Sequence, residues 1–320
     1  MNKLKVFIDG REGTTGLRIH ERLGGRDEIE LLLIEEEKRK DLSERLRLLD
    51  AADAAFLCLP DAASREICEA AEQEGITTRI LDTSTAHRTA EGWTYGFPEL
   101  HSGAQRELIR KAQKIAVPGC HATGFVSLAA PLVELGIAAP DYPFTVHSLT
   151  GYSGGGKKMI AAYEDAERPR GYSSPRQYAL GQTHKHLPEM TAVCGLSQAP
   201  VFNPIVADYY CGMEVTVPLH GRLLAKKVTP KEVAEALAQY YKGSALIKVH
   251  AYGVAPEDGT LPANKMAGSD ALEIFVLGRE EQMILVSRFD NLGKGASGAA
   301  VQCMNLALGL PETTGLATDL

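Results

Sequence analysis

The 320-residue sequence has no long uncharged apolar run, so we expect no transmembrane span. Its six cysteines show no CxxC pair and no His-rich spacing, which argues against a zinc site or a disulfide framework. The N-terminus enters a strand-like pattern without a signal-peptide profile, and we expect a cytoplasmic protein with reduced thiols. A net charge of −7 argues against a nucleic-acid binder.

The composition is that of an ordinary globular protein, with 44% hydrophobic and 23% charged residues, and the length suggests two domains. Strand-like and helix-like segments alternate in the first part of the chain. The expected strands are 4–8, 30–34, 54–59, 78–81 and 114–117, and the expected helices are 15–23, 40–49, 61–74 and 105–113. This alternation predicts an α/β domain with a doubly wound parallel sheet of the Rossmann type.

A glycine-rich turn follows the first expected strand. Gly10, Gly13 and Gly16 form G-x-x-G-x-x-G, a relative of the dinucleotide fingerprint, although such glycines also make plain tight turns. A strand, a glycine turn and a helix N-terminus together suit a pyrophosphate, and the ends of parallel strands bind ligands. We therefore expect cofactor contacts at Gly10, Gly13, Thr14, Thr15, Gly16, Leu59 and Pro60.

The segment after the second expected strand carries both signs of charge. It reads Glu35-Glu36-Glu37-Lys38-Arg39-Lys40, where an acid would bind the ribose hydroxyl of NAD and a base the 2′-phosphate of NADP. The segment does not decide between the two cofactors, and it could also be a solvated charge run.

The central stretch Val117 to Gly124 contains a candidate nucleophile. Pro118 and Gly119 form a tight corner between the strand that ends at Val117 and a helix expected at 122–135. Cys120 would then lie at a helix N-terminus, where the helix dipole favours a thiolate. A buried, inert cysteine is the alternative interpretation.

The second half of the chain is richer in strands. Expected strands cover 144–149, 213–217, 246–251, 271–277 and 283–289, and a helix covers 229–241, with Thr229 as its N-cap. These runs predict an α+β domain with a mostly antiparallel sheet. One face of such a sheet is free to pack on a partner, so we expect a homo-oligomer, a dimer or tetramer.

Three further stretches of this half could carry chemistry. The glycine-rich stretch 150–158 ends in two lysines and is either a phosphate loop or a flexible loop. After a polar loop at 164–182, His184 and His186 lie near Glu189 and could supply a base with its orienting partner, or be incidental surface residues. The stretch 290–298 is a glycine-rich helix start that suits a phosphate or a cofactor.

A nucleotide fold, a helix-capping cysteine and downstream histidines together favour one chemistry. A thiolate attacks an acyl phosphate and expels phosphate, and the resulting thioester is reduced by a nicotinamide to an aldehyde. The backbone N–H groups near Cys120 could stabilise the tetrahedral oxyanion.

These residues resemble the N-acetyl-γ-glutamyl-phosphate reductases in their short form, within the aspartate-semialdehyde dehydrogenase-like superfamily. The resemblance covers essentially the whole chain. It is carried by residues 9–17, 95–100, 118–120, 184–189 and 290–296.

The resemblance implies NADPH as cofactor, a small acyl-phosphate substrate and a place in arginine biosynthesis. It implies that Cys120 is the nucleophile, that His184 is the acid/base and that Glu189 orients it. It also implies substrate contacts at Ser148 and Gly151 and cofactor contacts at Asn291 and Gly295. This chain departs from the family at His121, where an aromatic residue usually follows the cysteine, so that a second histidine lies beside the thiol.

The resemblance further implies a division of the chain. An NADP-binding domain would span 1–118 and be completed by a C-terminal helical segment at 290–320, and a catalytic and oligomerisation domain would span 119–289. Two other functions stay open from the sequence. The chain could reduce another acyl phosphate, such as aspartyl phosphate, or it could be a non-enzymatic NAD(P)-binding redox sensor with Cys120 as its reactive thiol.

Overall fold

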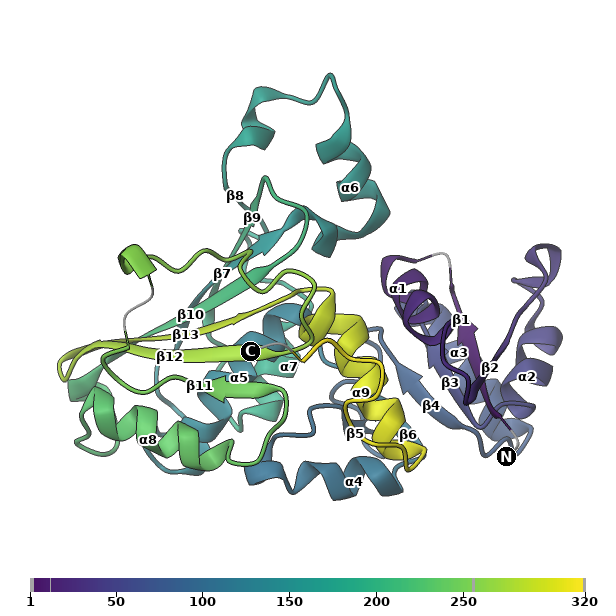
Figure 1. Ribbon diagram of the computed structural model, residues 1–320, viewed down its shortest axis with the longest axis horizontal. Helices are drawn as coiled ribbons and strands as arrows, with labels where there is room; N and C mark the ends of the chain where they lie inside the picture. The colour runs from purple at the N-terminus through teal and green to yellow at the C-terminus, as the bar shows by residue number, and fades with distance from the viewer. Residues whose placement is uncertain (1–2, 12, 255–256, 319–320) are drawn as a thin grey trace. The chain divides into compact units, whose positions relative to one another are not determined.

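The computed structural model describes residues 3–11, 13–254 and 257–318, so that Glu12 of the glycine turn lies outside the described residues. The chain forms two compact units (Figure 1). The first consists of Met1–Pro98, Arg106–Pro118 and Ala296–Leu316, and the second of Glu99–Gln105, Gly119–Gly295 and Ala317–Leu320.

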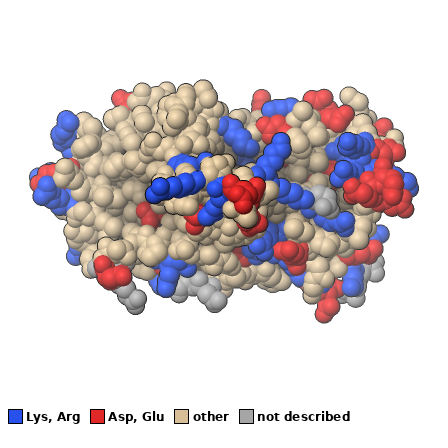
Figure 2. All heavy atoms as spheres, turned by 90° about the horizontal axis from the view of Figure 1, so that it is seen from above, with Lys and Arg blue, Asp and Glu red and all other residues tan. Residues whose placement is uncertain are grey.

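On the face seen in Figure 2, Lys and Arg side chains lie among Asp and Glu side chains.

The first unit contains a parallel sheet with the strand order β2-β1-β3-β4-β6-β5. Its strands are β1 (Leu4–Asp9), β2 (Ile29–Leu32), β3 (Ala54–Leu57), β4 (Arg79–Asp82), β5 (Thr94–Tyr95) and β6 (Lys114–Ala116). Its helices are α1 (Thr14–Leu23), α2 (Leu42–Asp50), α3 (Asp61–Gln73), α4 (Gln105–Lys111) and α9 (Gly298–Ala307). The predicted doubly wound sheet is therefore confirmed.

Alternate side chains of β1 explain how this sheet is covered on both faces. Val6 and Ile8 belong to a buried cluster with residues of α1 and α9. Phe7, between them, belongs to a second buried cluster with residues of α2 and α3. A strand covered on both faces can be apolar at every position, which is why these strands read as continuous apolar runs.

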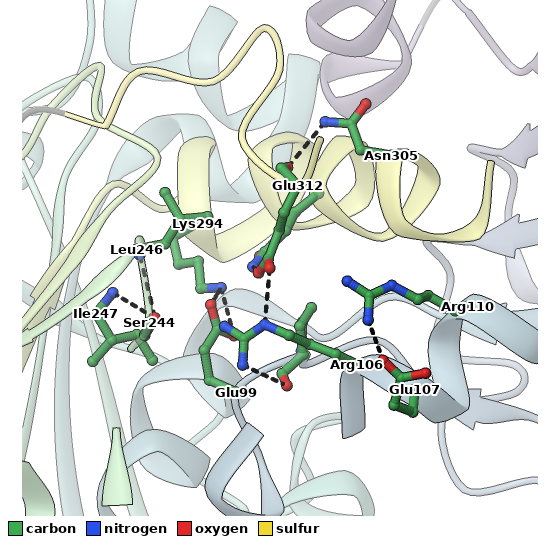
Figure 3. Close-up of polar contacts among 12 residues, drawn as sticks. Glu99, Arg106, Glu107, Arg110, Ser244, Leu246, Ile247, Lys294, Asn305 and Glu312 are labelled. Carbon is green, nitrogen blue, oxygen red and sulfur yellow. Dashed lines mark hydrogen bonds and ion pairs between the residues drawn. The ribbon is translucent and has the colours of Figure 1, made fainter. Parts of the chain in front are cut away.

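Polar contacts hold the C-terminal segment to the first unit. The Arg106 guanidinium donates to the Glu312 carboxylate at 2.8 Å, and the Asn305 amide donates to the Glu312 carbonyl oxygen at 3.0 Å (Figure 3). The last helix therefore returns to the unit that begins the chain.

The second unit contains a mixed sheet with the strand order β11-β12-β13-β10-β7-β9-β8. Its strands are β7 (Thr145–Gly151), β8 (Arg176–Gln177), β9 (Val201–Ala207), β10 (Met213–His220), β11 (Ile247–Val249), β12 (Leu272–Arg279) and β13 (Gln282–Phe289). The pairs β11–β12 and β7–β9 are parallel and the other neighbouring pairs are antiparallel, so the prediction of a mostly antiparallel sheet is confirmed.

Helix α5 (Cys120–Glu134) packs against this sheet, and all but a few of its residues are buried. A Cβ at Gly124 would lie 2.3 Å from Cγ2 of Val215 on β10 and 2.9 Å from the Phe289 ring on β13. Only glycine permits so close an approach of helix and sheet. This close contact fixes the position of α5 on the sheet, and hence the position of Cys120 at its start.

Three more helices complete the second unit, namely α6 (Gly156–Glu164), α7 (Leu187–Val193) and α8 (Pro230–Tyr240). The predicted N-cap of α8 is confirmed, since Thr229 and Glu232 form a reciprocal capping box. The sequence did not predict α6, because its first residues belong to a glycine-rich stretch that favours a loop. Among the described residues, no helix is long and apolar enough to cross a membrane.

Candidate active site

Cys120 lies at a helix N-terminus, as the sequence predicted, and α5 begins at this residue, two positions before the expected start at 122. Its N-cap, Gly119, is extended and makes no side-chain cap, so the first N–H groups of the helix have no side-chain acceptor at that position. The thiol is partly exposed. A Cβ at Gly295 would lie 3.0 Å from the Cys120 Cβ, so this predicted cofactor glycine packs directly against the candidate nucleophile.

A buried carboxylate holds the turn before Cys120. Glu189, in the first turn of α7, is 1% exposed, and its Oε1 accepts a hydrogen bond of 2.9 Å from the backbone N–H of Gly119. The bond fixes the corner from which the thiol projects. The orientation of His184 by Glu189 stays a prediction.

The histidines at 121, 184 and 186 form one cluster. The rings of His184 and His186 lie 4.7 Å apart between centroids, and the His121 ring lies 5.4 Å from His184 and 5.6 Å from His186. The Nδ1 atom of His184 accepts a hydrogen bond of 3.1 Å from the backbone N–H of His186. A neutral His184 ring in this geometry carries its proton on Nε2 and is a donor there. The fold thus brings the H-x-H motif to the residue next to Cys120.

His121 is buried between two hydroxyl groups. Its Nδ1 lies 2.6 Å from the Ser148 Oγ on β7, and its Nε2 lies 2.5 Å from the hydroxyl of Tyr178. Burial lowers the pKa of His121 to about 3, with a smaller contribution from the neighbouring His184. The His121 ring is therefore neutral. Ser148, the predicted substrate serine, contacts this histidine, which follows Cys120 directly in the sequence.

Tyr178 belongs to the site and was missed by sequence reasoning. It follows β8 in the polar segment that the sequence indicated only as a loop. Burial raises the pKa of its phenol, and the charge of a Cys120 thiolate raises that pKa further. Tyr178 and Cys120 are therefore electrostatic neighbours. No local pattern marks this tyrosine, because its contact with His121 spans 57 positions of the chain.

Gly151, a predicted substrate contact, and Asn291, a predicted cofactor contact, both form hydrogen bonds with the backbone of Gly212. The backbone N–H of Gly151 donates to the Gly212 carbonyl at 3.0 Å, and the backbone N–H of Gly212 donates to the Asn291 Oδ1 at 2.8 Å. The Asn291 amide also donates to the Ser153 hydroxyl at 3.0 Å. In the same segment as Asn291, Lys294 forms a fully buried ion pair with Glu99 at 2.8 Å (Figure 3).

The glycine turn of the first unit fits a dinucleotide phosphate. Gly10 has φ +85°, and a Cβ there would lie 2.3 Å from the Cys58 carbonyl oxygen. A Cβ at Gly16 would lie 2.6 Å from the Gly10 carbonyl oxygen. Gly13 is the N-cap of α1 and supplies no side-chain cap, and the buried Thr14 Oγ1 has no hydrogen-bond partner among the described residues. Thr15 follows in the first turn of α1. Bare helix N–H groups and an unsatisfied hydroxyl are what a bound phosphate requires.

A cleft of about 450 Å³ opens beside this turn, at the carboxyl ends of β1 to β3. Its lining includes both predicted residues that follow β3, Leu59 and Pro60. Its charged lining residues are Asp9, Arg11, Glu36, Arg39, Lys40, Arg45 and Glu66. The charge run at 35–40 therefore contributes to the cleft wall as well as to the solvated surface.

Two family models match the chain. Residues 5–108 match the model described as semialdehyde dehydrogenase, NAD binding domain, and residues 120–291 match that described as semialdehyde dehydrogenase, dimerisation domain. These matches define the class as the semialdehyde dehydrogenases.

Curated relatives are more specific. The chain is 46% identical to N-acetyl-gamma-glutamyl-phosphate reductase 2 of Nostoc sp., covering 99% of this chain and 100% of that one. It is 45% identical to N-acetyl-gamma-glutamyl-phosphate reductase of Rhizobium meliloti, covering 96% of this chain and 99% of that one. The chain belongs to the N-acetyl-γ-glutamyl-phosphate reductase family, as the resemblance of its motifs predicted.

Solved structures share the fold at lower identity. Aspartate semialdehyde dehydrogenase II of Vibrio cholerae, complexed with ASA, matches with a TM-score of 0.71 at 16% identity, over 97% of this chain and 99% of that one. Aspartate semialdehyde dehydrogenase of Candida albicans, with NADP, matches with a TM-score of 0.67 at 14% identity, over 95% of this chain and 98% of that one. These likenesses show a common architecture.

Proposed function

We propose that the chain reduces N-acetyl-L-glutamyl 5-phosphate to N-acetyl-L-glutamate 5-semialdehyde and phosphate with NADPH, in arginine biosynthesis. The observation that carries the proposal is the position of Cys120, at the start of α5 beside three histidines. In this proposal the first unit binds the cofactor, and the second carries catalysis and oligomerisation. The cytoplasm is the proposed location, where the six free thiols would stay reduced.

Covalent catalysis would begin at Cys120. Its sulfur attacks the acyl carbon, the bond from that carbon to the phosphate oxygen breaks, and phosphate leaves with the thiol proton. The first N–H groups of α5 favour the thiolate and the tetrahedral oxyanion. The Glu189 bond to Gly119 holds these N–H groups in place before the substrate arrives.

His184 would act as the proton donor. Because its Nδ1 accepts the backbone N–H of His186, its Nε2–H is the donating atom. In that role it would pass the thiol proton to the departing phosphate and, later, a proton from solvent to the sulfur that the aldehyde releases, so that the ring is neutral again after each step. His121 is unsuited to this role, since both of its ring nitrogens face hydroxyl partners.

The residues that would hold NADPH are those of the glycine turn and the cleft. When bound, the reduced nicotinamide supplies the hydride that converts the thioester to the aldehyde. Gly10, Gly13 and Thr14 would receive the pyrophosphate at the start of α1. Arg39 and Lys40 line the cleft and would pair with the 2′-phosphate, which is the group that distinguishes NADP from NAD. For Asn291 and Gly295, the proposed contact is with the nicotinamide end.

The substrate is proposed from the named relatives, which are 43–46% identical to this chain. Ser148 and Gly151 would contact it from the end of β7. The decisive experiment is the reverse reaction with NADP⁺ and phosphate, in which N-acetylglutamate semialdehyde is compared with aspartate semialdehyde. A higher kcat/KM for the aspartate compound would replace the proposed substrate, and failure with both would reject acyl-phosphate chemistry.

A further inference from the structure

Both ring nitrogens of His121 are occupied by hydroxyl groups. Nδ1 lies 2.6 Å from the Ser148 Oγ and Nε2 lies 2.5 Å from the Tyr178 hydroxyl. His121 and Ser148 are 3% and 0% exposed, so water does not compete for the bond between them, whereas Tyr178 is partly exposed. The three side chains form a continuous hydrogen-bonded chain from the strand that carries Ser148 to the loop that carries Tyr178.

The charge state of His121 limits the directions that its two hydrogen bonds can take. The ring is neutral, because burial lowers its pKa to about 3. A neutral imidazole has one N–H donor and one nitrogen acceptor. One hydroxyl must therefore donate to the ring while the ring donates to the other hydroxyl. Only the hydroxyl that accepts from the ring keeps its own proton for another partner.

The chemistry of the two hydroxyls selects the direction. The phenol oxygen of Tyr178 is conjugated with its ring, so it is a poorer acceptor than the alcohol oxygen of Ser148. Tyr178 would therefore donate to Nε2, and the Nδ1–H would donate to Ser148. Hydrogen bonds that run in one direction polarise one another, which strengthens the arrangement. The Ser148 hydroxyl proton is then available to a partner other than His121 and Tyr178.

We propose that His121 is a positioning residue whose Nδ1–H tautomer, set by Tyr178, directs the Ser148 hydroxyl proton toward an oxygen of the acyl phosphate. The identity of that ligand rests on the proposed function, whereas the tautomer and its dependence on Tyr178 do not. The histidine of this chain would therefore make Tyr178 a contributor to substrate positioning.

The first test is the tautomer itself, measured on the ligand-free full chain with ¹⁵N-labelled histidine. At about pH 5, well above the titration range of His121, the expected spectrum contains a neutral ring with its proton on Nδ1. That ring is identified because its Nε2 resonance shifts in Tyr178→Phe. It should not shift in Tyr172→Phe, a matched change of a phenol on the same segment. A charged ring, or a proton on Nε2, would overturn the proposal.

The second test is a double-mutant cycle on kcat/KM in the semialdehyde reaction. Tyr178→Phe should lower kcat/KM about tenfold in the natural chain, and by less than about twofold when Ser148→Ala is already present. Tyr172→Phe should leave kcat/KM unchanged. Equal effects of Tyr178→Phe in both backgrounds would show that the hydroxyls act independently, against the proposal. If no semialdehyde reacts, the proposed function fails, and the tautomer measurement still decides whether His121 bridges the two hydroxyls as proposed.

Discussion

The Glu189 carboxylate accepts the backbone N–H of Gly119 across 70 positions of the chain, one residue before the Cys120 thiol. The acceptor is 1% exposed, so the bond is shielded from water. This contact joins the H-x-H-x-P-E segment to the nucleophile turn through the backbone, so the carboxylate positions the thiol whichever histidine moves the proton.

Replacing this carboxylate tests the contact. Glu189→Ala leaves a buried N–H without its acceptor, which we expect to cost about 1–3 kcal/mol in the free energy of unfolding. Glu189→Gln keeps an oxygen at the same place and should be milder in urea unfolding and in kcat. Equal stability of the natural chain and Glu189→Ala would show that the bond contributes nothing.

Cys120→Ser should be nearly inactive, because a serine hydroxyl is far less ionised than a thiol at a helix N-terminus. NADPH binding, measured by calorimetry, should survive. Iodoacetamide should label Cys120 first, since burial raises the pKa of Cys58 and of Cys68 to about 12. Mass spectrometry of enzyme quenched with acyl phosphate, in the absence of NADPH, should show an acyl adduct on Cys120. A fully active Cys120→Ser variant would exclude the thioester.

His184→Asn should lower kcat by about 10²–10⁴-fold, the usual cost of losing a general acid/base. NADPH affinity should stay unchanged. His186→Asn is the matched control from the same motif, and it keeps the backbone N–H that His184 accepts. A larger loss in His186→Asn would exchange the two roles.

Gly13→Leu should abolish NADPH binding without unfolding the chain. A Cβ at Gly13 would lie 3.5 Å from the Gly10 carbonyl oxygen, an ordinary contact, so the larger side chain can extend into the phosphate site. Gly16→Ala is the contrasting variant, because its Cβ would lie only 2.6 Å from that oxygen and should disturb the turn itself. Unchanged affinity in a folded Gly13→Leu protein would move the cofactor elsewhere.

NADPH should be preferred over NADH, and Arg39→Ala should reduce that preference. Loss of one cation at the 2′-phosphate should raise the KM for NADPH about tenfold, equivalent to one charge-assisted hydrogen bond, and leave the KM for NADH unchanged. Lys38→Ala is the matched control, since Lys38 lies in the same charge run and is absent from the cleft lining. A natural chain that prefers NADH would instead make an acid of residues 35–37 the ribose ligand.

The elements that sequence reasoning found are those with local causes. The apolar strands of the first unit, the glycine turn after β1, the Thr229 cap and the helix start at Cys120 all depend on residues close together in the chain. Strand β9 was not defined, since Pro204 lies inside it and proline opposes a strand assignment. Helix α6 was not predicted because it begins at the end of a glycine-rich stretch. Its Tyr163 is buried and stacks on Tyr152, which is stabilisation that only the folded chain reveals.

The candidate site divides in the same way. Cys120 could be selected from residue type and position, and His184 and His186 only as a pair. The resemblance supplied the choice of His184 and the role of Ser148. Tyr178 could not be selected, because only the pairing of β8 with β9 places its loop near His121. The hydrogen bond from the Gly119 N–H to the Glu189 carboxylate likewise depends on where α7 packs, and the spacing of residues in the sequence does not predict that position.

The buried pair of Glu99 and Lys294 has a consequence for how the sequence can vary. Neither side chain is reached by solvent, so changing one alone leaves a buried charge without its ion-pair partner, at a cost of about 3–5 kcal/mol. Exchanging both together for apolar residues of similar volume carries no such penalty. We therefore expect the two positions, 195 apart in the chain, to tolerate substitution together more readily than singly.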